Sequence, residues 1–108
     1  MKELKDKKFN LFGKKYTLKF VDTLDDDPYI KEEGDVLYGI TIHPYGEIKV
    51  SKSVKDKART ENEIEITKFH ELFHAMFDAG AYYDLNCNEP LVEWLAKCAW
   101  TLKKQGVI

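Results

Sequence analysis

Two histidines and a glutamate in the second half of the chain have the spacing of a metal site. The stretch His70-Glu71-Leu72-Phe73-His74 reads HExxH. Residues four apart lie on one face of a helix, so the two imidazoles can bind a single zinc ion. Glu71 would project beside the metal toward its bound water, where a carboxylate can accept a proton. The alternative is a pair of packed histidines that flank a surface glutamate.

A catalytic zinc site needs a third protein ligand and one open position. No histidine follows His74, and the residue six positions beyond it is Gly80, which excludes a third histidine at that spacing. The remaining downstream donors are Asp78, Asp84, Cys87, Glu89 and Glu93. Asp78 is the nearest, but a ligand from a second element closes a tetrahedral site more easily.

Glu89 and Glu93 can come from such a second element. They are four residues apart and therefore share a helix face. One carboxylate can bind zinc while the other accepts a hydrogen bond from the outer nitrogen of a ligating histidine. We expect Glu89 to be the ligand and Glu93 its outer partner, and the reverse assignment stays open.

With these residues the chain resembles the gluzincin clan of zinc metallopeptidases, in which HExxH on one helix is followed by NExxxD on the next. Here residues 88–93 read NEPLVE, with Glu93 in place of the aspartate. The chain is also similar to very short metallopeptidase-like proteins of phages and mobile elements, through HELFHA at 70–75 and VEWLA at 92–96. The resemblance implies a small zincin-like domain, Zn²⁺ as cofactor, and hydrolysis of peptide bonds in a peptide or protein substrate.

Three further residues are candidates for stabilising an oxyanion. His43 lies on the strand face opposite Ile40 and Ile42, so it either faces a cleft or is solvated. Tyr82 and Tyr83 lie between the two metal-bearing segments and either donate to a tetrahedral intermediate or pack their loop onto the core.

The first half of the chain has the alternation of β-strands. Tyr16, Leu18 and Phe20 alternate with polar residues, and residues 9–11 repeat the pattern before a turn at Gly13. Residues 36–42 and 47–50 alternate in the same way around the turn at 44–46. The acidic stretch at 25–28 is expected to be a solvated turn. We therefore predict two antiparallel hairpins.

The second half has the signals of two helices. Thr60 and Glu63 form a capping box, which predicts a helix from Glu61, and Gly80 is expected to end it in the left-handed conformation. Asn88 is a good N-cap for a second helix that runs to Gly106. A loop should span residues 80–87. The expected class is α+β, with a small antiparallel sheet packed on two helices.

Composition limits the classes of function. A length of 108 residues suits a single domain, 1–108, and a net charge of −2 provides no broad basic surface for nucleic acid or an anionic membrane. Two cysteines form no disulfide framework, and the charged N-terminus has no signal-peptide character. We expect a cytoplasmic protein, with a host cytoplasm as the location if it is phage-encoded; the oligomeric state stays open.

Two functional hypotheses follow from the site. The first is a zinc metallopeptidase in which a strand at the sheet edge holds an extended peptide by main-chain pairing. The second is a catalytically silent, zinc-stabilised module that binds another protein. Both require zinc, but only the first requires the carboxylate of Glu71.

Overall fold

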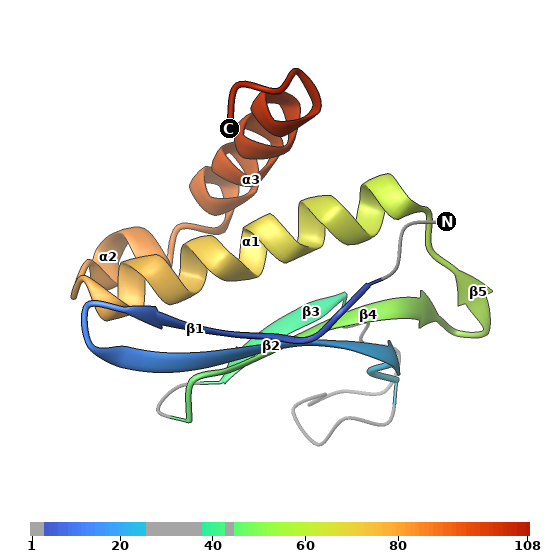
Figure 1. Cartoon of the computed structure of the whole chain (residues 1–108), viewed down its shortest axis with the longest axis horizontal. Coiled ribbons are helices and arrows are strands. Elements are labelled where there is room, and N and C mark those ends of the chain that lie inside the picture. Colours follow the sequence, from blue (N-terminus) through green and yellow to red (C-terminus); the bar gives the residue numbers. More distant parts are fainter. Residues whose placement is uncertain (1–3, 26–37, 43–44) are drawn as a thin grey trace.

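The structure, a computed structural model, describes residues 4–25, 38–42 and 45–108, and the strands within them form one sheet (Figure 1). The strands are β1 (Lys7–Leu11), β2 (Lys14–Thr23), β3 (Gly39–Ile42), β4 (Glu47–Val54) and β5 (Lys57–Ala58). The helices are α1 (Glu61–Ala79), α2 (Tyr83–Asn86) and α3 (Glu89–Lys104). The predicted α+β class is confirmed.

The sheet is mixed, so the expectation of an antiparallel sheet is wrong. Its order is β1-β2-β4-β3, with β5 paired to β4. Both predicted hairpins are present as antiparallel pairs, but β2 and β4 join them by parallel pairing. The parallel register places Leu18 beside Ile48 and Phe20 beside Val50, which brings apolar side chains of both central strands together. Alternation within a hairpin carries no information about this long-range pairing.

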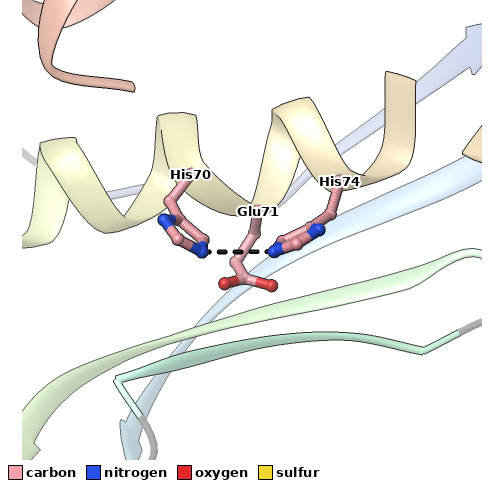
Figure 2. Close-up of side chains that lie close together, drawn as sticks. All are labelled: His70, Glu71 and His74. Atoms are coloured by element: carbon pink, nitrogen blue, oxygen red, sulfur yellow. Dashed lines mark hydrogen bonds between the residues drawn. The ribbon is translucent and has the colours of Figure 1, made fainter. Parts of the chain in front are cut away.

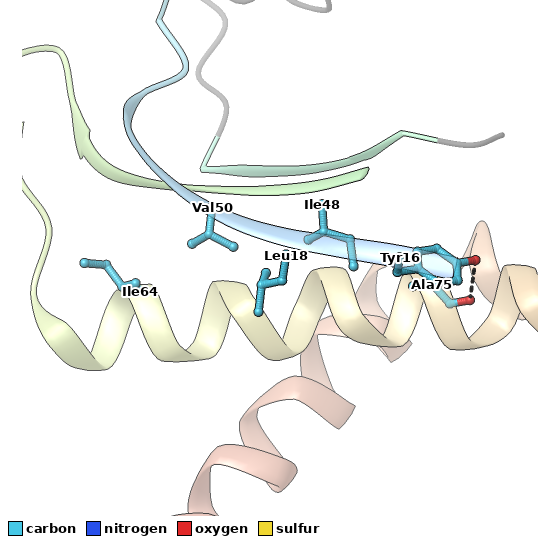
Figure 3. Close-up of a cluster of buried hydrophobic side chains, with 6 residues drawn as sticks. All are labelled: Tyr16, Leu18, Ile48, Val50, Ile64 and Ala75. Carbon is cyan, nitrogen blue, oxygen red and sulfur yellow. Dashed lines mark hydrogen bonds between the residues drawn. The ribbon is translucent and has the colours of Figure 1, made fainter. Parts of the chain in front are cut away.

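The core lies between the sheet and α1 (Figure 3). Tyr16, Leu18, Ile48 and Val50 from the central strands pack there with two residues of α1. The residues of α1 that are buried form a stripe at helical spacing: Ile64, Thr67, Glu71 and Ala75. The large apolar residues of α1 lie on the other face of the helix, away from this stripe, and are half-buried or, for Met76, exposed: Ile66, Phe69, Phe73, Met76 and Phe77. The middle glutamate of HExxH therefore faces the sheet.

Strand β3 approaches α1 closely at Gly39, where there is no room for a side chain. A Cβ atom at Gly39 would lie 2.7 Å from Cγ2 of Thr67 and 2.9 Å from Cγ of Glu71. Both separations are shorter than a van der Waals contact between carbons, so glycine is needed here. This close approach brings the edge of the sheet to the centre of the HExxH motif.

Helix α1 begins as predicted and ends differently. The side chain of Thr60 accepts a hydrogen bond from the Glu63 amide, and the carboxylate of Glu63 accepts one from the Thr60 amide. Gly80 has φ −88°, so the predicted left-handed glycine is wrong; Ala81 adopts φ +63° instead. The Tyr82 amide then donates to the carbonyl of Phe77 at 2.8 Å, which closes the end of the helix as in a Schellman motif.

The segment predicted to be a loop contains the short helix α2, which leads into α3. Asn88 caps α3 as predicted, because its side chain accepts a hydrogen bond from the amide of Leu91. Helix α3 packs on the side of α1 away from the sheet and buries Val92 and Ala96 (Figure 1). Among the described helices, none has the length and apolar character needed to cross a membrane.

Candidate metal centre

His70, Glu71 and His74 form a candidate metal-binding triad in the middle of α1. One ligand atom from each of the three lies within 4.8 Å of the others. The imidazoles point toward each other, with 3.2 Å between the two Nε2 atoms, and the Glu71 carboxylate lies between them on the side of the sheet (Figure 2). The triad follows from helix periodicity, because residues 70 and 74 are about one turn apart on one face.

Glu89, the first residue of α3, lies across both imidazoles. Its Oε2 is 2.9 Å from Nε2 of His70, and its Oε1 is 3.0 Å from Nε2 of His74. Helix α2 brings the chain back over α1, so that the start of α3 meets the HExxH face. The structure thus brings together the two histidines and the glutamate that sequence reasoning selected as ligands.

Two side chains contact the outer nitrogens of the imidazoles. Oε1 of Glu93 is 3.5 Å from Nδ1 of His70, the place expected for an outer partner. Oδ1 of Asn86 is 2.7 Å from Nδ1 of His74. Sequence reasoning missed Asn86, because a helix of four residues has no periodicity to reveal it; its position three residues before Glu89 was the available signal.

A hydrogen bond to Asn86 orients the imidazole of His74. Oδ1 of Asn86 can only accept, so Nδ1 of His74 carries a proton and Nε2 is the nitrogen left to bind a metal ion. This Nε2, Nε2 of His70 and the carboxylate of Glu89 face one another. In the neutral imidazoles both Nε2 atoms would be acceptors, and a cation would then match all three groups.

The donor set fits zinc. Imidazole nitrogens and a carboxylate oxygen are ordinary zinc ligands. Ligands about 2.0–2.1 Å from a tetrahedral zinc ion are about 3.3–3.4 Å apart. The two Nε2 atoms are 3.2 Å apart, close to that separation, and the nitrogen–oxygen contacts to Glu89 are slightly shorter. The residues present can therefore hold the ion that the HExxH spacing predicts.

The Glu71 side chain is held in place from the sheet. It is 7% exposed, and one carboxylate oxygen lies 2.9 Å from the hydroxyl of Thr41 on β3. Burial raises the pKa of Glu71, while the hydrogen bond from Thr41 and positive charge on the two histidines oppose the rise. A raised pKa brings a carboxyl group closer to the pH at which a general base works best.

Two hollows flank the triad along β3. One, of about 450 Å³, is lined by Gly39–Thr41 of β3 together with the triad, Asn86 and Glu89. The other, of about 430 Å³, lies beside His70 and Glu71 and is lined by Tyr38 and Arg59. Strand β3 is at the edge of the sheet within the described part of the chain, and its residue Gly39 lines both hollows.

The other residues singled out from the sequence lie elsewhere or play other parts. Tyr82 and Tyr83 are each 62% exposed, and neither lines the two hollows. Cys87 is exposed and lines the hollow that contains Glu89, whereas Asp78 accepts a hydrogen bond from Lys14 at 2.8 Å, away from the triad. His43 lies outside the described residues, as does most of the acidic stretch 25–28.

Comparison with known proteins identifies no relative. No family model matches the chain, and neither the curated proteins nor the solved structures contain a match. The function of this protein must therefore be inferred from the geometry of the site.

Proposed function

We propose that this protein is a zinc-dependent hydrolase of peptide bonds. The observation that carries the proposal is the position of Glu89, whose carboxylate lies within 3.0 Å of Nε2 of both His70 and His74. Two imidazoles and one carboxylate are the protein ligands of a zinc site that keeps one position open. The buried carboxylate of Glu71 lies beside this set, where a proton acceptor is needed.

The chain supplies the metal ligands and the proton acceptor. His70, His74 and Glu89 would hold zinc, which when bound acidifies a water molecule and polarises the scissile carbonyl. Glu71 accepts the proton of the attacking water and then donates it to the leaving amide nitrogen. The Thr41 hydroxyl keeps the Glu71 carboxylate oriented, while Asn86 and Glu93 hold the two imidazole rings.

Strand β3 supports a peptide as the substrate. One side of it pairs with β4, and its residues line the hollows around the triad. An extended peptide can add to an exposed strand edge through main-chain hydrogen bonds, which place a peptide bond near the strand without requiring a particular sequence. We propose that β3 is the strand that binds substrate.

A zinc-stabilised binding module is the second candidate, and the packing of α3 favours it. This helix packs on α1 and α2, and within the described part of the chain it has no comparable packing against the sheet. Glu89 and Glu93 of α3 both contact the histidines of α1, so a shared metal ion would fasten α3 to the rest of the molecule. Such a site stabilises the fold whether or not catalysis occurs.

Replacing Glu71 by Gln separates the two candidates. We expect the variant to bind one zinc ion per chain, measured by elemental analysis, and to lose nearly all cleavage of a peptide library, because an amide cannot accept the proton. Glu61→Gln, at the exposed start of the same helix, is the matched control and should cleave normally. The peptidase proposal fails, and the binding module stands, if the zinc-loaded protein cleaves no peptide or if Glu71→Gln cleaves as well as the wild type does. If the wild-type protein holds no zinc at neutral pH, both proposals fail.

A further inference from the structure

A separate cavity of about 590 Å³ lies on the other side of α1 from the triad. It is bounded by the β1–β2 hairpin and by Glu65, Phe69 and Leu72 of α1. At about 100° per residue, these α1 side chains lie on the helix face opposite His70 and His74. None of the described residues lines both this cavity and a hollow at the triad.

The walls of the cavity are apolar and its charged groups are almost all positive. Aromatic rings from both sides contribute, with Phe9 and Phe20 from the hairpin and Phe69 from α1. Among the residues that the structure describes, five lysines line it, against the single acidic side chain of Glu65. The whole chain has a net charge of −2, so this concentration of positive charge is local to the cavity.

The positive charge is held next to the apolar wall. The Glu65 carboxylate accepts from Nζ of Lys68 at 2.9 Å and from Nζ of Lys103 at 3.3 Å. Both ammonium groups also lie over the Phe69 ring, 4.7 Å and 5.7 Å from its centroid. Each ammonium group has three N–H donors, and the two groups share one carboxylate. They can therefore donate hydrogen bonds to a second anion and attract its charge.

We propose that this cavity binds an amphiphilic anion, a free long-chain carboxylate, with its acyl chain between the hairpin and α1 and its head group beside Lys68 and Lys103. The volume is within the range of about 300–1,000 Å³ typical of small-molecule sites. Aromatic and aliphatic walls exclude water from the chain, and the lysines provide the charge that complements the head group. The site is independent of zinc and of the proposed hydrolysis.

Calorimetric titration of the whole protein with saturated carboxylates of increasing length, kept below micelle-forming concentrations, tests the chain-binding part. We expect one carboxylate per chain and an affinity that rises about fourfold for each added methylene until the cavity is full. The alcohol of the same length should bind at least tenfold more weakly because it lacks the charge. Affinity that is independent of chain length, or equal for the alcohol, would overturn the proposal.

Lysine variants test the position of the head group. Lys103→Gln and Lys68→Gln should each weaken decanoate binding about tenfold. Lys97→Gln, on the same helix as Lys103, is the control and should bind decanoate as the wild type does. His74→Ala should also bind decanoate normally, which separates this proposal from the zinc site. Binding to anionic vesicles without binding to free decanoate would point to a membrane as the ligand and overturn the proposal. Self-association that decanoate does not disturb would point to a second copy of the chain and would also overturn it.

Discussion

The hydroxyl of Thr41 lies 2.9 Å from a carboxylate oxygen of Glu71, and this contact joins the edge strand β3 to the centre of α1. The same hydroxyl is 3.1 Å from the backbone carbonyl of Glu71. The two residues are thirty positions apart in the chain. Their contact makes the orientation of the proposed proton acceptor depend on the position of the sheet edge.

Thr41→Val should disturb Glu71 without unfolding the protein. Valine has nearly the same shape and suits a strand, but it leaves a buried carboxylate oxygen without its donor, which costs about 1–3 kcal/mol in the free energy of unfolding. Any peptide cleavage should fall about 10- to 100-fold, as for other residues that support a site. Thr41→Ser keeps the hydroxyl and should recover both properties; a serine variant as impaired as the valine variant would argue against the hydrogen bond.

Replacement of the two glutamates of α3 should distinguish their roles. Glu89→Ala should weaken zinc binding far more than Glu93→Ala, because Glu89 contacts Nε2 of both histidines and Glu93 only an outer nitrogen. The loss for Glu93→Ala should be about 10- to 100-fold. Competition against a chromophoric chelator measures both affinities. The opposite order would make Glu93 the ligand.

Asn86→Ala should weaken zinc binding through His74. The imidazole would lose the acceptor that holds the proton on Nδ1, and the expected loss of affinity is about 10- to 100-fold. Nitrogen NMR shifts of the imidazole should show a mixture of tautomers in place of one. Asn86→Asp retains an acceptor and should bind zinc well, while Asn62→Ala, at an exposed asparagine near the start of α1, is the control. An unchanged tautomer in Asn86→Ala would contradict the proposed role.

Gly39→Ala should force β3 and α1 apart. The new methyl group would meet Thr67 at 2.7 Å and Glu71 at 2.9 Å, and overpacking of this kind costs about 1–3 kcal/mol. Urea unfolding followed by circular dichroism measures the loss. Adding Thr67→Ser removes the nearest carbon and keeps the hydroxyl that Arg59 contacts, so the double variant should regain part of the stability. If Gly39→Ala is as stable as the wild type, β3 and α1 are packed less tightly at Gly39 than these distances indicate.

Stability should fall at alkaline pH because of Tyr16 and Lys14. Burial raises the pKa of Tyr16 above its usual 10.0, and a hydrogen bond to Asp78 raises the pKa of Lys14 above 10.5. The folded protein keeps these protons where the unfolded chain loses them, so the contribution of these two groups to the free energy of unfolding is constant below about pH 10 and decreases as the pH rises further. In Tyr16→Phe the free energy of unfolding should decrease less steeply between pH 10 and 11, as measured by urea unfolding at each pH. An identical slope would exclude Tyr16 as a cause.

The local parts of the candidate site could be predicted from short stretches of the sequence. The capping box of Thr60 and Glu63 predicted the start of α1, and this helix places His70 and His74 on one face. Spacing also predicted that residues 89 and 93 share a face of the next helix. These features depend on hydrogen bonds between residues three or four apart, so their signals lie within short stretches of the chain.

The contacts between distant parts of the chain could not be predicted in this way, because they depend on how the elements pack. The parallel pairing of β2 with β4, the hydrogen bond from Thr41 to Glu71 and the contact of Asn86 with His74 all join elements that have no shared periodicity. The apolar cavity with its lysines likewise needs the β1–β2 hairpin and α1 to be packed together. Such contacts result from the burial of whole faces, and that burial depends on how all the elements pack at once, which no short stretch of sequence encodes.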